Sequence, residues 1–318
     1  MDLQFVTLDV FTSKRLQGNP LAVVTIPAEI KDVITQERKQ KIAQEFNLSE
    51  TVFLHEVAEP DQAQQKQRDI DIFTIESELP YAGHPTIGSA VLVKYSLHPH
   101  VDTLVTKAGP IGIVPQPGNA IRARIPHNVR LHAKTLVDVL GSDDATKYPG
   151  LSHVPQIREA ELKAPVFSVV KGMTFVLVRL PSLELLAQVS VAHGIDFANL
   201  PKPLLDEGWR DSFVSRYYYV DMGDEKGERS IRSRMLELGF EDPATGSAAT
   251  ALGSYLTLNE EKKGRKFQVT QGVEIGRTSN ISVETTTKDP GDGSVALEEL
   301  WLGGTAVVVQ RGILTLDA

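Results

Sequence analysis

The sequence contains no cysteine among its 318 residues. This absence excludes disulfides, thiolate zinc sites, iron–sulfur ligation and a cysteine nucleophile. The chain is also short of positive charge, with 33 Lys and Arg residues against 41 Asp and Glu residues and a net charge of −8. A nucleic-acid partner is therefore not expected, because a surface that follows phosphates is normally basic. Hydrophobic residues make up 41% of the chain and charged residues 23%, as in ordinary globular proteins.

Long apolar runs are missing as well. No stretch approaches the roughly 20 apolar residues that a membrane-spanning helix needs. The first segment, MDLQFVTLDVF, has an acid at position 2 and no cationic start, so it is typical of a first strand and not of a signal peptide. We therefore expect a cytoplasmic protein that has no membrane partner.

Many short strands and a few helices are predicted from the hydrophobic patterns. Helices are expected at 35–46, 83–97, 182–190 and 246–258. Single strands are expected at 3–11, 21–26, 49–54, 69–75, 213–220, 231–236, 267–271, 279–285, 296–302 and 305–316, and strand pairs at 111–126 and 164–182. The helices at 83–97 and 246–258 are apolar on nearly all sides, which indicates buried helices. This mixture predicts an α+β fold.

Two segments of the chain resemble one another. ELPYAGHPTIG begins at Glu78 and EDPATGSAATA begins at Glu241, an offset of 241 − 78 = 163 that also aligns Gly83 with Gly246. Each segment follows a strand-like stretch and opens one of the two buried helices. We interpret the pair as an internal duplication, which predicts two similar lobes.

The two glycines at these helix starts predict an anion site. Glycine lets a ligand approach the backbone closely. The first turn of a helix has unpaired N–H groups and partial positive charge from the helix dipole, so it suits a small anion such as a carboxylate. The alternative is that Gly83 and Gly246 simply begin well-capped core helices.

One acid stands in an apolar strand. In NLSETVFL, Glu50 shares a face with Val52 and Leu54 if the strand alternates with a period of two. It is either an acid at a strand end that reaches water or a residue kept for chemistry. His84 and Ser247, which follow the two glycines, could equally be capping residues.

Five motifs occur together along the chain: Phe11 with GNP (18–20), NLSETVF (47–53), ELPYAGHPTIG (78–88), EDPATGSAA (241–249) and QGVEIGR (271–277). As a set they resemble the phenazine-biosynthesis PhzF-like isomerases, whose fold is similar to that of diaminopimelate epimerase. The resemblance implies two lobes, each a curved, mostly antiparallel sheet around a central helix. The lobes would comprise 1–125 with about 305–318, and 126–304, with the active site at the lobe interface. The resemblance implies no cofactor and no metal, and it allows a homodimer.

The resemblance also assigns roles to residues. Glu50 matches the proton-transferring glutamate of the family, and His84 and Asp242 match further polar residues of its catalytic site. The substrate-binding set implied in the same way is Asn19, Ser49, Gly83, Gly246 and Ser247. Ala82 and Thr245 stand where diaminopimelate epimerase and proline racemase carry their pair of cysteines. Two-thiol racemisation is therefore not expected.

These observations predict a cofactor-independent isomerase that acts on a small unsaturated carboxylate metabolite. Glu50 would remove a proton from one carbon and return it to another in a 1,3-type shift. A lyase or cyclase on the same scaffold is one alternative, and the mass of the product distinguishes it. A non-catalytic protein that binds small carboxylates is the other.

Overall fold

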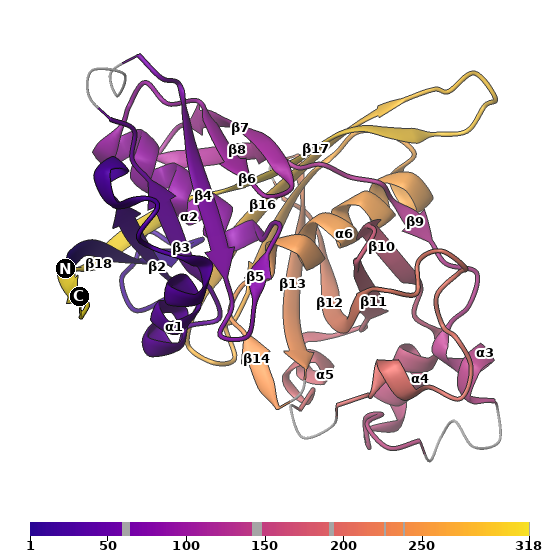
Figure 1. The fold of residues 1–318 in the computed structure, drawn as a ribbon. Coiled ribbons are helices and arrows are strands. Elements are labelled where there is room, and N and C mark those ends of the chain that lie inside the picture. Colours follow the sequence, from indigo (N-terminus) through magenta and orange to yellow (C-terminus); the bar gives the residue numbers. More distant parts are fainter. Residues whose placement is uncertain (59–63, 142–147, 191–193, 226, 238, 318) are drawn as a thin grey trace. The chain divides into compact units, whose positions relative to one another are not determined.

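The structure is a computed structural model that describes residues 1–58, 64–141, 148–190, 194–225, 227–237 and 239–317. The chain divides into two compact units (Figure 1). The first unit comprises Met1–Arg124 and Leu302–Ala318, and the second comprises Ile125–Trp301. Within the described ranges, none of the helices is both long enough and apolar enough to cross a membrane.

The first unit is a curved sheet with two main helices. Its elements are β1 (Asp2–Val10), β2 (Asn19–Ile26), α1 (Gln36–Phe46), β3 (Thr51–His55), β4 (Gln67–Phe73), β5 (Glu78–Leu79), α2 (Gly83–Leu92), β6 (Thr103–Thr106), β7 (Gly109–Gln116), β8 (Ala120–Arg124) and β18 (Ala306–Thr315). The strands pair in the order β18–β1–β2–β3–β4–β6–β7–β8, with β5 also on β4. Only β2–β3 and β4–β6 are parallel, and α1 and α2 lie in these two crossovers, as parallel pairs require.

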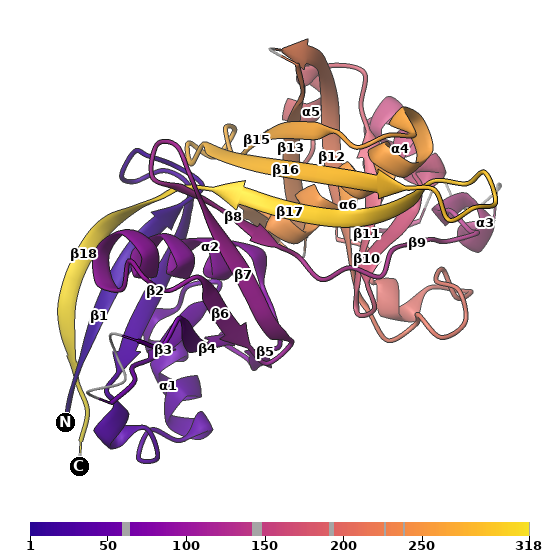
Figure 2. The ribbon, with the colours of Figure 1, turned by 90° about the horizontal axis from the view of Figure 1, so that it is seen from above.

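Helix α2 is the centre of this unit (Figure 2). All ten of its residues are buried, and it contacts strands from both ends of the sheet order, including β18 and β8. Gly88 allows the close approach, because a Cβ there would lie 2.6 Å from Leu21 Cδ2 and 2.7 Å from Val10 Cγ2. The sheet therefore curls around a helix that must be made of small and apolar residues.

Strand β3 is buried along its whole length. Phe53 belongs to a cluster with Ile42 and Ala43 of α1, so α1 covers one face of the sheet while α2 contacts β3 as well. A strand covered on both faces does not need alternating polarity. This explains why Val52, Phe53 and Leu54 follow one another with no polar residue between them.

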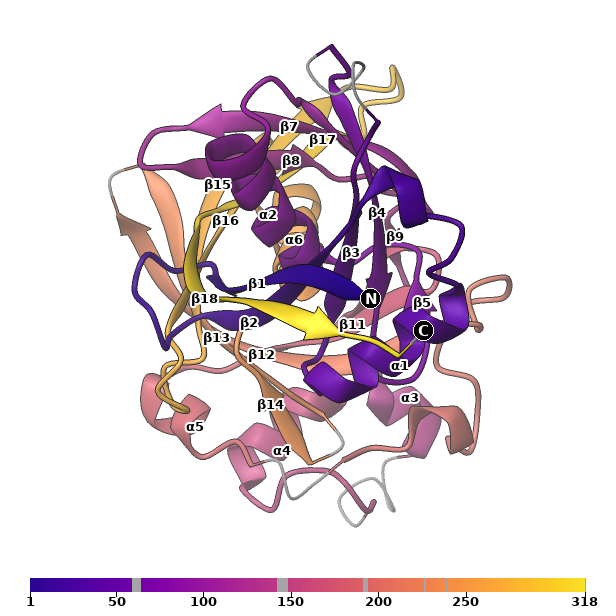
Figure 3. The same ribbon diagram turned by 60° about the vertical axis from the view of Figure 1, so that its left-hand side comes forward.

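The chain ends meet within the first unit. β18 runs antiparallel to β1, from Asp2 opposite Thr315 to Val10 opposite Ala306 (Figure 3). The Met1 amino group donates to the Leu316 carbonyl oxygen at 2.7 Å. The last strand of the sequence therefore completes the first sheet.

The second unit repeats this plan. Its elements are β9 (Arg130–Leu131), α3 (Leu136–Leu140), α4 (Pro155–Lys163), β10 (Val166–Val170), β11 (Met173–Arg179), α5 (Leu183–Ala187), β12 (Phe213–Glu225), β13 (Glu228–Glu237), β14 (Phe240–Asp242), α6 (Gly246–Leu256), β15 (Lys266–Gln271), β16 (Ser279–Lys288) and β17 (Ala296–Gly304). Its strands pair in the order β9–β10–β11–β12–β13–β15–β16, with β14 also on β13. β11–β12 and β13–β15 are the parallel pairs, and α5 and α6 lie in their crossovers.

The two pairing orders correspond strand for strand. β18, β1, β2, β3, β4, β5, β6 and β7 match β9, β10, β11, β12, β13, β14, β15 and β16, and α2 matches α6. Both central helices also end in a π-helical turn, at Val93–Leu97 and at Thr257–Glu261. The expected α+β fold of two similar lobes, each a sheet around a central helix, is confirmed. The helices expected at 83–97 and 246–258 are present, and each continues from α-helical into π-helical geometry at its C-terminal end, the second as far as Glu261.

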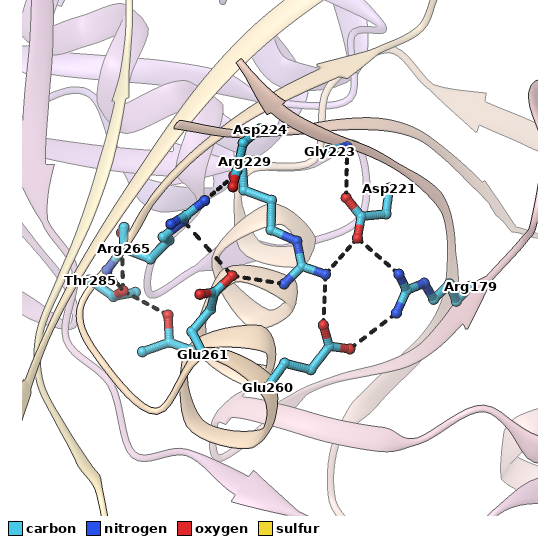
Figure 4. A network of polar contacts seen from close by, with 10 residues as sticks. Arg179, Asp221, Gly223, Asp224, Arg229, Glu260, Glu261, Arg265 and Thr285 are labelled. Carbon is cyan, nitrogen blue, oxygen red and sulfur yellow. Dashed lines mark hydrogen bonds and ion pairs between the residues drawn. The ribbon is translucent and has the colours of Figure 1, made fainter. Parts of the chain in front are cut away.

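A cluster of charged side chains lies at the C-terminal end of α6 (Figure 4). Glu260 and Glu261 lie at the C-terminal end of the helix, where negative charge is unfavourable to the helix dipole. Arg229 offsets this, because its guanidinium lies 2.6 Å from Glu260 and 3.2 Å from Glu261. It also lies 2.6 Å from Asp221, so the cluster joins the β12–β13 hairpin to the end of α6.

Candidate active site

Glu50 lies in the short link between α1 and β3. Asn47 ends α1 in the left-handed conformation, with φ of 50°, and its N–H donates to the Ala43 carbonyl oxygen. Asparagine tolerates this conformation better than most residues and so makes a compact helix end. Four residues later the chain enters β3 at Thr51, which holds Glu50 at the start of a buried strand.

The Glu50 carboxyl group is poorly solvated. Its side chain is 16% exposed, and Oε2 is buried with no hydrogen-bond partner among the described residues. Burial raises the pKa of Glu50 from 4.5 to about 7, although a hydrogen bond with the Ser49 side chain acts to lower it. The sequence allowed Glu50 to be either an acid at a strand end that reaches water or a residue kept for chemistry. The buried environment does not fit the first interpretation.

His84, in the first turn of α2, faces Glu50. Its Nε2 lies 3.6 Å from Glu50 Oε2, slightly beyond hydrogen-bond distance. On the other side of the ring, Nδ1 lies 3.4 Å from the Asn19 amide nitrogen. An amide NH₂ can only donate, so this contact requires Nδ1 to accept and places the ring proton of a neutral His84 on Nε2, toward Glu50.

The start of α2 is suited to an anion. Its N-cap residue is Ala82, which has no side-chain group to accept a hydrogen bond from the first turn. By contrast, the Thr35 side chain caps α1 by accepting from the Arg38 N–H. Among the described residues, no N-cap side chain therefore accepts a hydrogen bond from the first N–H groups of α2, which begin at Gly83.

The second unit has a corresponding arrangement at α6. Thr245 is the N-cap residue, but its side chain does not cap the helix and instead donates to Asp242 Oδ2 at 2.6 Å. Gly246, which begins the helix, is buried, and Ser247 is half-buried. Asp242 ends β14, so strand and helix together set its position.

The predicted site residues therefore form two groups. Within the first unit, Asn19, Glu50 and His84 come together, with Ser49 beside Glu50 and Gly83 beside His84. Asn19 is 1% exposed and contacts His84, so the structure shows it supporting the histidine. Within the second unit, Asp242, Gly246 and Ser247 surround the start of α6. That both groups serve one substrate stays a prediction.

The sequence reasoning missed the role of Gln271. The residue is fully buried, and its amide contacts both Thr245 and the backbone of Asp242. A signal was present, because a period of two in KFQVTQ places Gln271 on the same face as the buried Phe267 and Val269. A glutamine on an apolar face needs polar partners, which is a sign of a buried network.

No set of three or more His, Asp or Glu residues is arranged to hold a metal ion, as far as the described ranges extend. The groups available for chemistry in these residues are a carboxyl group, an imidazole and two helix N-termini.

Comparison with protein families matches residues 8–312 to the family described as "Phenazine biosynthesis-like protein". The chain belongs to this PhzC/PhzF family. It is 32% identical to an uncharacterized isomerase of Mesorhizobium japonicum, over 98% of both chains. It is 30% identical to the trans-2,3-dihydro-3-hydroxyanthranilate isomerase of Pseudomonas aeruginosa, over 87% of this chain and 88% of that one.

A solved member of the family has the same fold. The phenazine biosynthesis protein of Bacillus anthracis, of the PhzF family, matches 99% of this chain and 100% of its own with a TM-score of 0.71 at 22% identity. As a PhzF-type protein the chain is an isomerase. Since its sequence has no cysteine, it is not a two-cysteine racemase.

Proposed function

We propose that this PhzF-type isomerase moves a proton between two carbons of a small unsaturated carboxylate metabolite, with Glu50 as the general acid and base. The observation that carries the proposal is the buried Glu50 carboxyl group, whose Oε2 lacks a hydrogen-bond partner among the described residues and whose pKa lies at about 7. A group that titrates near neutral pH can both accept and return a proton efficiently.

One base suits a shift in which the proton leaves and returns on the same face of the substrate. Inversion of a stereocentre normally needs a second base on the opposite face. Proline-racemase-type chemistry would place thiols at the positions of Ala82 and Thr245, and neither an alanine nor a threonine supplies a base there. This supports a 1,3-type shift over racemisation.

The substrate carboxylate is assigned to the uncapped helix starts. Backbone N–H groups and the helix dipole favour an anion at Gly83, and the same argument holds at Gly246. His84 would donate from Nε2 to hold or polarise the substrate beside Glu50. The named substrate of the Pseudomonas relative, trans-2,3-dihydro-3-hydroxyanthranilate, is a small unsaturated carboxylate and so is the first compound to test.

The test is incubation of the enzyme in heavy water with this compound and with a pool of small carboxylates, followed by mass spectrometry. Wild type should give an isomer of the substrate in which the only change of composition is the replacement of a hydrogen by deuterium from the solvent. Glu50→Gln should fold but lose about 10²- to 10⁴-fold in turnover, because proton transfer by a positioned side chain contributes a factor of this size. Glu45→Gln, an exposed change on α1, is the matched control and should behave as wild type.

Each alternative has its own outcome. A product that has lost water would favour a lyase or cyclase on this scaffold. Binding of carboxylates without turnover, unaffected by Glu50→Gln, would favour a non-catalytic binding protein. A folded Glu50→Gln variant with full activity would remove Glu50 from the mechanism.

A further inference from the structure

A buried chain of hydrogen bonds lies behind Asp242 in the second unit. It runs from Ser233 through Tyr217 and Gln271 to Thr245, with distances of 2.8 Å, 3.0 Å and 3.0 Å between side chains. The last step joins Thr245 Oγ1 to Asp242 Oδ2 at 2.6 Å. Ser233, Tyr217 and Gln271 are all 0% exposed, so the chain is shielded from water.

The direction of every proton around Gln271 is fixed by its backbone partners. The Thr245 N–H can only donate, and it donates to Gln271 Oε1 at 3.2 Å. The Asp242 carbonyl oxygen can only accept, and it accepts from Gln271 Nε2 at 2.8 Å. The side-chain amide of Gln271 therefore has a single orientation.

This orientation decides the role of the Thr245 hydroxyl. Gln271 Nε2 has a second proton, which it donates to Thr245 Oγ1. The proton of the hydroxyl itself is then directed to Asp242 Oδ2. The Ala244 N–H reaches Asp242 Oδ1 at 3.4 Å, so both carboxylate oxygens face donors.

We infer that Gln271 is a positioning residue that acts through Thr245 to keep Asp242 an ionised hydrogen-bond acceptor. This inference deepens and rests on the proposed function: Asp242 would orient an N–H or O–H group of the substrate and would not relay the transferred proton. It also gives a reason for threonine at this helix start. The hydroxyl is committed to Asp242 and is not available to act as a base.

The test uses variants that change the donors but keep the shape. Thr245→Val removes the hydroxyl, and Thr245→Ser keeps it. Gln271→Glu replaces the donating Nε2 with an acceptor, so the Thr245 proton would turn away from Asp242. Gln268→Glu, on the same strand but only half-buried, is the matched control. Circular dichroism and thermal unfolding would establish which variants are folded.

The first readout needs no substrate. The carboxyl carbon resonance of Asp242, followed by NMR as the pH is lowered, should titrate about one to two pH units higher in Thr245→Val and Gln271→Glu than in wild type, because a lost hydrogen bond to a charged group has this effect. Thr245→Ser and Gln268→Glu should titrate as wild type. An unchanged titration in folded Thr245→Val would overturn the inference, whatever the activity.

The second readout is steady-state kinetics. The two disruptive variants should lose roughly 10- to 100-fold in kcat/KM, mainly through a higher KM, and Thr245→Ser should restore it. A loss confined to kcat would show that Asp242 takes part in proton relay and would overturn the assignment. The titration of Asp242 could also shift in the variants while wild type shows no turnover. Gln271 would then still be a positioning residue, and only the proposed function would be contradicted.

Discussion

At the scale of single residues, the proposed chemistry depends on an acid, Glu50, that the fold leaves poorly solvated. Glu50 lies in the link between the end of α1 and the start of β3, a strand covered on both faces. Little water therefore reaches its carboxyl group. The unfolded chain would solvate the same group fully. Folding therefore favours the protonated form, and the stability of the protein must depend on pH through this residue.

Replacing Glu50 should stabilise the protein at high pH. The native pKa of about 7 lies above the ordinary 4.5, so stability from Glu50 is complete below pH 4.5 and falls as the pH rises to 7. Glu50→Gln resembles the protonated acid and avoids this loss. We expect it to be more stable than wild type by about 1–3 kcal/mol at pH 8 and equal to it near pH 4.

Urea unfolding at the two pH values, with Glu45→Gln as the control, measures this difference. A Glu50→Gln variant no more stable than wild type at pH 8 would show that the carboxyl group is solvated after all. A residue whose replacement makes the protein more stable is typically one that is retained for function and not for stability.

At the scale of elements, the charged cluster in Figure 4 holds the end of α6 in place. Burial acts to lower the pKa of Arg229, but its hydrogen bonds with Asp221 and Glu260 outweigh this and raise it. For Asp221 burial acts to raise the pKa, but hydrogen bonds from Arg229 and the Gly223 N–H, together with the charges of Arg229 and Arg179, outweigh it, so the pKa falls. The cluster is therefore stabilising when its carboxylates are ionised, and this contribution is lost as the pH falls through the lowered pKa of Asp221.

Arg229→Met should destabilise the second unit by about 2–4 kcal/mol at pH 7, because it leaves three partly buried carboxylates without their shared cation. Arg210→Met, at an exposed position, is the control and should have little effect. The measurement is urea unfolding at pH 7 and at pH 3. Arg229→Lys offers a milder change if the first variant does not fold. An equal loss at both pH values would show that Arg229 acts by packing and not by charge.

The sequence predicted those elements that depend on local signals. The end of α1 at Phe46, the strand pair within 164–182 and the two small-residue helix starts all follow from residue type and spacing. The repeat of Glu78 at Glu241 predicted two similar lobes. By contrast, the parallel pairings across α1 and α5 and the two short strands β5 and β14 depend on contacts between distant segments, which no local pattern records.

The site was predicted in the same uneven way. Glu50 and His84 stand in motifs that can be recognised, but whether an acid is solvated depends on what covers it. Asn19 and Gln271 act through partners that are 65 and 26 residues away. A polar side chain in a strand shows that partners must exist, and only the fold shows which ones they are.

At the scale of the whole molecule, the first unit is built from both ends of the chain. β18 pairs with β1 along nearly its full length and also contacts α2. The segment that carries Glu50 and His84 thus belongs to a sheet that is complete only when residues 302–318 have been added. Pairing the two ends closes a very long loop, which carries an entropic cost that the contacts of β18 must offset.

Deleting residues 302–318 should therefore unfold the first unit while leaving the second one folded. The deletion removes the partner of β1 and uncovers one side of α2, a helix whose residues are all buried. Limited proteolysis should cleave within residues 1–124 of the shortened chain, and amide hydrogen exchange should show protection confined to 125–301. A chain shortened only by residues 317–318, beyond the end of β18, should match wild type. Retained protection of β1 and α2 in the longer deletion would mean that β18 only extends a sheet that is already stable. The expected result would instead make the last strand a condition for forming the Glu50 environment.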